Sequence, residues 1–254
     1  MRENRLRKRK SENKPAICSW VSCDNSFITE LAAHGPVDGV VIDTQHGMAD
    51  AHSMPAQLQA ISTTDKTPIV RVRSLDSGLV MKALDAGAQA IICPLINTAD
   101  EARELVFAGR YPPQGGRSFG PARGVLYGGP DYFKTANDTI MILAMIETQE
   151  GLANLDEILA VEGLDGIFIG PSDMAVTMGH APGPEGAYDD VEAAIERCVT
   201  AAKAAGKYTG IFCSGGKGAR MRADQGFDMV VPNHDGNLYS MMLKQQVEIF
   251  NGKA

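Results

Sequence analysis

Short apolar segments alternate with amphipathic segments along almost the entire chain of 254 residues. A short, continuous apolar segment bounded by turn residues is typical of a strand that is buried on both faces, as the strands of parallel sheets are. Segments of this kind lie at residues 15–20, 38–43, 68–72, 89–95, 140–147, 165–170, 208–213 and 228–232. The alternation therefore predicts an α/β fold built around a parallel sheet.

The segments between these strands carry helical patterns. They cover residues 27–35, 54–62, 78–87, 99–109, 151–161, 191–206, 217–226 and 237–250. Several of them end at a glycine, as a left-handed helix C-terminus requires. Eight strand–helix units in about 250 residues match a (β/α)8 TIM barrel. A doubly wound open sheet is the alternative, and the lack of a GxGxxG turn after the first strand counts against it.

Composition excludes several classes of protein. The net charge of −7 argues against general nucleic-acid binding. No apolar segment approaches the roughly 18 residues that span a bilayer, and no secretory signal pattern is present. We therefore expect a cytoplasmic protein with neither a nucleic-acid nor a membrane partner. The five cysteines lack CxxC spacing, so no disulfide framework or zinc site is expected, and Cys93, Cys198 and Cys213 are expected to be buried.

Two segments stand apart from the repeating pattern. Residues 1–14 are strongly basic, and we interpret them as a solvated leader or a first helix rather than as an arm that binds nucleic acid or membrane. Residues 15–254 then form one domain. Residues 110–137 are rich in Gly and Pro without a strand pattern, so they are expected to lie on the bottom face or between a helix and a strand, where they could reach a neighbouring subunit or fold over a site. Arg117 and Arg123 are interpreted as surface charges, with an anion contact as the alternative.

Two acids follow apolar strand segments, Glu147 in MILAMIE and Asp173 in GIFIGPSD. The carboxyl ends of parallel barrel strands open onto one face, so these carboxylates are expected to converge. Oxygen ligands of this kind suit Mg²⁺ or Mn²⁺, and Co²⁺ is also compatible. Singly, Glu147 could be a helix N-terminal acid and Asp173 an N-cap.

Other strand ends carry further candidates. Asp43 and His46 follow the second strand, where histidine could serve as a general acid or base. Arg71 ends the third strand and could clamp a carboxylate or stabilise a developing enolate, with Arg73 as a competing candidate.

The turn formed by Gly170, Pro171, Ser172 and Asp173 allows close backbone approach and could bind a substrate carboxylate at a helix N-terminus. The strand ends in this set carry no lysine, which argues against a Schiff-base aldolase.

The chain resembles the HpcH/HpaI aldolases, which are metal-dependent pyruvate aldolases. The resemblance rests on VVIDTQHG, PIVRV, LDAGAQAIICPLINTADEA, RYPPQGGRSFG, MIETQEGLANLDEIL and VEGLDGIFIGPSDM, and it extends over nearly the whole chain. It implies a (β/α)8 barrel that reversibly cleaves a 4-hydroxy-2-oxo acid to pyruvate, or a close 2-oxo acid, and an aldehyde through a metal-bound enolate. It also implies a hexamer, a trimer of dimers, with exchanged C-terminal helices, a role that fits residues 237–250.

The resemblance also implies roles for individual residues. Glu147 and Asp173 match the metal ligands, and Arg71 matches the residue that binds the C2 oxygen of pyruvate. His46 matches the acid/base residue, which acts with a metal-bound water. Asp85 matches an aspartate that partners this histidine, and from its helix end it would have to reach the histidine of a neighbouring subunit.

Two positions depart from the family pattern. Gln45 replaces an acid that often precedes the histidine, and Met145 replaces a glutamine that commonly lies two residues before the metal glutamate. A shifted substrate specificity is the corresponding hypothesis. Two alternative functions stay open at this point: an acyl-CoA lyase of the citrate lyase β or malyl-CoA type, and a catalytically impaired barrel that acts as a binding protein.

Overall fold

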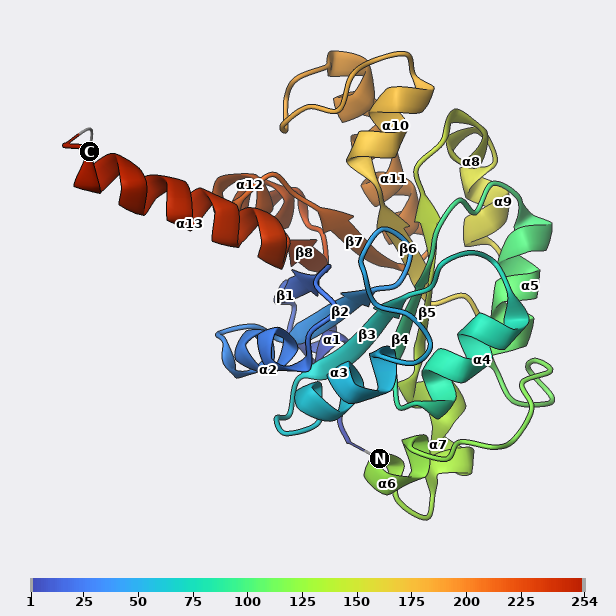
Figure 1. Ribbon diagram of the computed structural model, residues 1–254. Helices are drawn as coiled ribbons and strands as arrows, with labels where there is room; N and C mark the ends of the chain where they lie inside the picture. The colour runs from blue at the N-terminus through green and yellow to red at the C-terminus, as the bar shows by residue number, and fades with distance from the viewer. Residues whose placement is uncertain (1, 253–254) are drawn as a thin grey trace.

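The structure, a computed structural model that describes residues 2–252, is a closed parallel barrel with helices around it (Figure 1). Each strand pairs with the next along the chain, and the last strand pairs with the first. The strands are β1 (Ala16–Val21), β2 (Gly39–Asp43), β3 (Thr67–Arg71), β4 (Ala90–Cys93), β5 (Met141–Ile146), β6 (Gly166–Ile169), β7 (Tyr208–Phe212) and β8 (Met229–Val231). The predicted (β/α)8 barrel is confirmed.

The strands are apolar along their length because both of their faces are buried. One apolar layer fills the inside of the barrel and contains Ile69, Ile92 and Phe168. The other layer lies between the strands and the surrounding helices and contains Ile42 and Ile142. Side chains alternate between the two layers along each strand. The carboxyl ends of all eight strands therefore share one face, where the polar residues after each strand can meet.

The chain forms helices before, between and after the strands, and most of them cover the outside of the barrel (Figure 1). They are α1 (Arg5–Ser11), α2 (Ser26–His34), α3 (Met54–Ile61), α4 (Ser77–Asp85), α5 (Ala99–Gly109), α6 (Gly124–Gly128), α7 (Tyr132–Thr139), α8 (Gln149–Ala153), α9 (Leu155–Leu159), α10 (Pro171–Thr177), α11 (Asp189–Ala204), α12 (Gly216–Gln225) and α13 (Asp235–Phe250). The helix predicted over 151–161 divides into α8 and α9 at Asn154. Within residues 2–252, no helix is both long and apolar enough to span a membrane.

The basic N-terminal segment forms α1, which closes the bottom of the barrel instead of remaining solvated. Leu6 of α1 is fully buried in the inner layer. The basic side chains pair with acids at the amino ends of strands: Arg5 with Asp38 at 3.1 Å, and Lys10 with Asp228 at 3.1 Å. The positive charge of this segment is thus used to attach the helix to the barrel.

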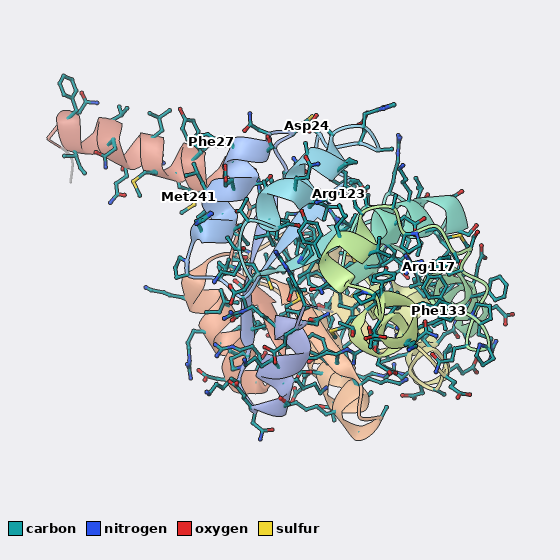
Figure 2. All side chains as sticks on the ribbon, turned by 90° about the horizontal axis from the view of Figure 1, so that it is seen from below. Asp24, Phe27, Arg117, Arg123, Phe133 and Met241 are labelled. Atoms are coloured by element: carbon teal, nitrogen blue, oxygen red, sulfur yellow. The ribbon has the colours of Figure 1, made fainter. Side chains whose placement is uncertain are left out.

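The Gly/Pro-rich segment 110–137 lies on the bottom face, which is one of the two positions expected for it. It contains α6 and the first part of α7 (Figure 1). The interpretation of Arg117 as a surface charge is wrong, because the residue is only 2% exposed. Its Nη2 donates to Asp85 Oδ1 at 2.8 Å and to the Tyr132 hydroxyl at 3.0 Å. Arg123 also packs back onto the chain and donates to the carbonyl of Ala86 at 2.6 Å. Figure 2 shows both arginines from below.

The C-terminal helix α13 projects away from the barrel (Figure 1). None of its described residues is buried, although it carries Leu238, Met242 and Ile249 at helical spacing. On the barrel itself, Ile17, on the outer face of β1, is 42% exposed, and Phe27 of α2 is 63% exposed. Apolar surface is therefore exposed both on α13 and at these positions of the barrel.

Candidate active site

A cavity of about 320 Å³ opens at the carboxyl ends of the strands. It is lined by most of the residues predicted for a site, namely Asp43, His46, Arg71, Gly170, Pro171, Ser172 and Asp173. Glu147 lies immediately behind Gly170, while Asp85 lies elsewhere. Strand ends far apart in the sequence are brought together here because a parallel barrel places all its carboxyl ends on one rim.

Arg71 is held rigidly at this rim. It is the last residue of β3, and its Nε and Nη2 donate to the two carboxylate oxygens of Asp43 at 2.9 and 2.6 Å. Burial would raise the pKa of Asp43, but the hydrogen bond and charge of Arg71 outweigh it and hold that pKa below its ordinary value of 3.8. A bidentate pair of this kind fixes the plane of the guanidinium. Arg73, the competing candidate, is exposed and lines a different cavity.

Trp20 is a member of this arrangement that sequence reasoning missed. Its indole Nε1 donates to Asp43 Oδ2 at 3.2 Å, and the Arg71 guanidinium lies 4.8 Å from the centre of its ring. The aromatic face and the carboxylate together orient the guanidinium from two directions. The available signal was that Trp20 is the chain's single tryptophan and lies near the end of a strand.

Glu147 is buried directly after β5 and is only 2% exposed. Its Oε1 accepts a hydrogen bond from the backbone N–H of Leu95 at 2.8 Å. Its Oε2 faces Gly170, where a Cβ would lie 2.5 Å from that oxygen, so the position requires glycine. The close backbone approach expected at Gly170 is therefore present, and it serves the carboxylate of Glu147.

Asp173 is near enough to Glu147 for the two charges to interact. Burial raises the pKa of Glu147 from its ordinary value of 4.5 to about 7, and the charge of Asp173 contributes in the same direction. Gly170, not Asp173, is the N-cap of α10, and Asp173 lies in the first turn of that helix. Within residues 2–252, no group of three or more His, Cys, Asp and Glu side chains is arranged to hold a metal ion.

The carboxylate pair nevertheless fits a divalent cation. Glu147 and Asp173 are both oxygen donors with the same sign of charge, and they lie at one rim. Burial, with the charge of Asp173 in the same direction, raises the pKa of Glu147 and so makes its negative charge unfavourable. A divalent cation would remove that unfavourable charge, and carboxylate oxygens are the ligands that Mg²⁺ and Mn²⁺ prefer. Two protein ligands would leave several coordination positions for a substrate.

The burial of Glu147 predicts a pH-dependent stability in the presence of a chelator. Between pH 4.5 and 7 the folded protein retains the proton that the unfolded chain releases, so the free energy of unfolding falls as the pH rises. A pKa difference of about 2.5 corresponds to roughly 3 kcal/mol across this window. Urea unfolding with EDTA at pH 5 and pH 8 measures the loss. Glu147→Gln should lack it, and an identical pH slope in both proteins would contradict this origin.

His46 lines the cavity from the loop after β2 and is exposed. Its backbone N–H donates to Asp43 Oδ1 at 3.2 Å, so the side chain of Asp43 positions the loop rather than the imidazole. The ring is therefore free to face the cavity. A second histidine at this rim, His234, was not predicted; its Nδ1 accepts from the N–H of Asn237 and caps α13.

Asp85 lies outside this cavity. It is the last residue of α4, and its carboxylate accepts a hydrogen bond from Arg117. The structure therefore does not bring Asp85 to the site within one chain. The two positions that depart from the family pattern lie nearer to the cavity than Asp85 does. Met145 lines the cavity. Gln45 lies two residues after Asp43, and its buried Oε1 lacks a hydrogen-bond partner among the described residues.

Comparison with known proteins finds relatives that match nearly the whole chain. Residues 16–240 match the family described as HpcH/HpaI aldolase/citrate lyase. A hydroxypyruvate/pyruvate aldolase of Rhizorhabdus wittichii is 42% identical over 96% of this chain and 97% of its own length. A 4-hydroxy-2-oxo-heptane-1,7-dioate aldolase of Shigella sonnei is 35% identical over 99% of this chain and 97% of its own.

A solved structure shares the same architecture. It is a HpcH/HpaI aldolase/citrate lyase family protein from Burkholderia cenocepacia, with 30% identity and a TM-score of 0.91 over 98% of this chain and 99% of that one. The matches extend over nearly the full length at the level of sequence and of fold. The chain therefore belongs to the HpcH/HpaI aldolase/citrate lyase family and is a carbon–carbon lyase of the aldolase type.

Proposed function

We propose that the protein reversibly cleaves a 4-hydroxy-2-oxo acid into an aldehyde and pyruvate or a close 2-oxo acid, with Mg²⁺ or Mn²⁺ held by Glu147 and Asp173. The observation that carries the proposal is one cavity in which Arg71, fixed by Asp43, lies at the same rim as the carboxylate pair. The names of the two relatives, a hydroxypyruvate/pyruvate aldolase and an aldolase of a 4-hydroxy-2-oxo dioate, support the same substrate class.

The side chains divide the chemistry between them. When bound, the cation supplies Lewis-acid polarisation of the 2-oxo acid. Arg71 stabilises negative charge on the C2 oxygen as the C3–C4 bond breaks, because its guanidinium is buried and already oriented. The backbone N–H groups of Ser172 and Asp173, in the first turn of α10, bind the substrate carboxylate. Pro171 has no N–H and fixes the start of that turn.

Proton transfer falls to His46. The imidazole accepts the C4 hydroxyl proton as the C3–C4 bond breaks, so the departing fragment leaves as an aldehyde. The resulting enolate then takes a proton at C3 to give the 2-oxo acid. The exposed position of His46 on the cavity wall allows it to exchange protons with solvent between the two steps.

A screen of 4-hydroxy-2-oxo acids, with pyruvate detected and with Mg²⁺, Mn²⁺ or EDTA added, tests the proposal. We expect cleavage that depends on the added cation and is abolished by EDTA. In deuterated water the enzyme should also exchange the methyl protons of pyruvate, which reports enolate formation without any aldehyde. Full activity in EDTA would exclude the role of the cation, and absence of both cleavage and exchange would exclude the reaction.

We propose further that the protein is a homo-oligomer, of hexameric type, in which α13 packs on a neighbouring subunit. The exposed apolar residues of α13 and the exposed Ile17 and Phe27 are alike in apolar character, and none of them is buried by the rest of residues 2–252. Exchange of α13 between subunits would bury both. An assembled oligomer could also bring Asp85 of one subunit to His46 of the next, which one chain cannot do.

The double variant Leu238→Glu with Met242→Glu tests this assembly. Two charges on the apolar side of α13 cannot be buried without a large desolvation cost, so the oligomer is expected to dissociate. Light scattering coupled to size exclusion measures the mass. The exposed Lys244→Gln on the same helix is the control and should leave the mass unchanged. A double variant with the mass of the unmodified protein would contradict the exchange.

A further inference from the structure

Two polar side chains of the catalytic cavity, the cavity of about 320 Å³ at the carboxyl ends of the strands, have no role in the reaction described above. Ser22 directly follows β1 and His234 follows β8, and both line this cavity. Among the described residues, neither the Ser22 hydroxyl nor His234 Nε2 has a hydrogen-bond partner. Polar groups of this kind on a cavity wall are available to a ligand.

The two side chains come from adjacent parts of the rim. Trp20, two residues before Ser22, forms a parallel β-bridge with His234, and the backbone N–H of Ser22 donates to Asp235 Oδ1 at 2.9 Å. The ring of His234 is oriented by α13, because its Nδ1 accepts from the N–H of Asn237 at 3.4 Å. With Nδ1 as an acceptor, the neutral ring carries its proton on Nε2, which is therefore a donor.

This pair lies beside His46, on the side away from Arg71. The carbonyl of Ser22 accepts from the N–H of Met48 at 2.8 Å, which attaches the loop that carries His46 to the end of β1. In the barrel β2 lies between β1 and β3. His46, which follows β2, therefore has Arg71 of β3 on one side and the pair of Ser22 and His234 on the other.

The proposed reaction gives the substrate a direction across the cavity. The substrate carboxylate binds at the start of α10, after β6, and its C4 hydroxyl lies at His46, after β2. These two strands are on opposite sides of the closed barrel, so the group beyond C4 lies at the wall around His46. The side of Arg71 is taken by the C2 oxygen. The remaining side is the one that carries Ser22 and His234.

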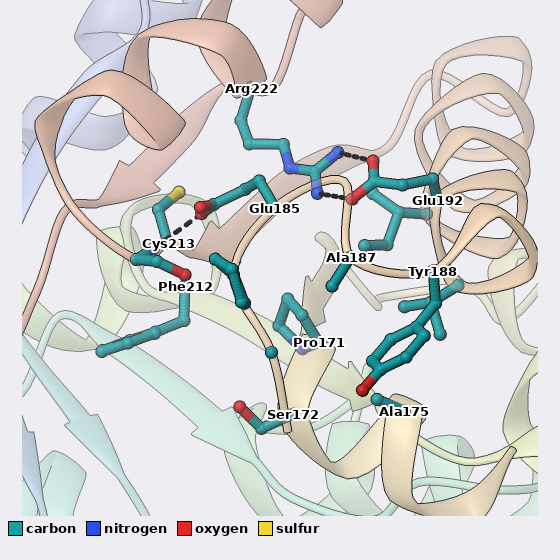
Figure 3. Close-up of a pocket in the computed structure, with 15 residues that line it drawn as sticks. Pro171, Ser172, Ala175, Glu185, Ala187, Tyr188, Glu192, Phe212, Cys213 and Arg222 are labelled. Atoms are coloured by element: carbon teal, nitrogen blue, oxygen red, sulfur yellow. Dashed lines mark hydrogen bonds and ion pairs between the residues drawn. The ribbon is translucent and has the colours of Figure 1, made fainter. Parts of the chain in front are cut away.

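The charges around the cavity suit an uncharged group at this wall. Arg71 is the only Lys or Arg among the described residues that line the cavity, and it is already bound to Asp43. The smaller cavity next to it, of about 70 Å³, contains Arg222, but both carboxylate oxygens of Glu192 accept from that guanidinium (Figure 3). No lysine or arginine of either cavity is therefore free to bind a carboxylate on the aldehyde half.

We propose that Ser22 and His234 form a subsite for a hydroxyl group on the aldehyde half of the substrate, so that the enzyme prefers hydroxylated aldehydes to alkyl aldehydes of the same size. This inference rests on the proposed aldol reaction. A hydroxyl can accept from His234 Nε2 and exchange a hydrogen bond with the Ser22 hydroxyl. An alkyl group would displace water from both without replacing its hydrogen bonds. The discrimination is moderate, because the His234 side chain is 40% exposed.

The test compares glycolaldehyde with propanal, which has a methyl group in place of the hydroxyl, in the addition to pyruvate. We expect glycolaldehyde to be the better acceptor of the unmodified protein. The ratio of kcat/KM for glycolaldehyde over propanal should fall roughly three- to tenfold in either Ser22→Ala or His234→Ser. Serine is a good N-cap, so the second variant removes the ring but keeps a cap for α13. Alanine at position 22 keeps the backbone N–H that Asp235 binds.

The matched control is His52→Ser, the same exchange at an exposed histidine that lies outside this cavity. Its ratio should stay within about twofold of that of the unmodified protein. Structural damage lowers kcat/KM for both aldehydes alike, so an unchanged ratio in both Ser22→Ala and His234→Ser would overturn the subsite. An equal fall in His52→Ser would also overturn it. Exchange of pyruvate methyl protons tests the reaction separately: its absence from the unmodified protein would overturn the proposed function itself.

Discussion

Replacing Arg71 with alanine is expected to lower kcat for cleavage by about 10²–10³-fold. The estimate corresponds to the loss of roughly 3–4 kcal/mol of transition-state stabilisation, as is typical when one preorganised donor to a developing oxyanion is removed. The donor is preorganised here because Asp43 binds the guanidinium at two points and Trp20 covers its face. Steady-state kinetics with saturating cation measures the effect, and a near-normal kcat would refute the role.

Arg73→Ala is the matched control for this variant. It removes the same charge two residues farther along the chain, but Arg73 is exposed and lies outside the catalytic cavity. Its kcat should change by less than about threefold. Arg71→Ala also leaves the buried carboxylate of Asp43 without its partner, so some loss of thermal stability is expected. A variant that is still folded by circular dichroism but inactive separates the catalytic effect from this structural one.

Replacing Glu147 with glutamine is expected to weaken binding of the divalent cation by more than about 100-fold. Substitution of groups that only orient metal ligands already costs about 10–100-fold in affinity, and Glu147 is a proposed ligand itself. Titration with Mn²⁺, followed by electron paramagnetic resonance, reports binding independently of turnover. Cleavage activity should fall in parallel.

The same substitution should stabilise the protein at pH 8 in EDTA, because it removes a buried carboxylate whose pKa is raised to about 7. Loss of metal binding together with a gain in stability would distinguish a functional residue from a structural one. The control is Glu150→Gln, an exposed acid in the first turn of α8. It should retain Mn²⁺ affinity, and Mn²⁺ binding by Glu147→Gln as tight as in the unmodified protein would contradict the proposed site.

Much of the barrel could be predicted from the sequence because a strand that is buried on both faces appears in the sequence as a continuous apolar segment. Strand β5 shows this: all six of its residues are buried, and the chain reads as a continuous apolar segment over them. Helix α6 could not be predicted in this way, because its five residues contain two glycines and show no helical periodicity. Short helices of this kind are stabilised by tertiary packing rather than by their own sequence.

Site residues could be predicted only where their position at the end of a strand was enough to place them at the rim of the barrel. Arg71 ends β3 and Glu147 directly follows β5, and barrel topology alone places both on one rim. Arg117 was misjudged because an arginine in a polar loop is usually exposed, whereas here the loop folds back and buries it against Asp85. That contact joins residues 32 positions apart, which no local pattern encodes.

The sequence by itself determined the barrel, the family and the rim on which the chemistry-bearing residues gather, because periodicity encodes burial and a closed parallel sheet has one carboxyl face. Only the tertiary structure decided which groups touch. It placed Trp20 against Arg71 and Gly170 against Glu147. Such contacts depend on side-chain directions between elements distant in the chain, and these directions are set by packing rather than by residue order.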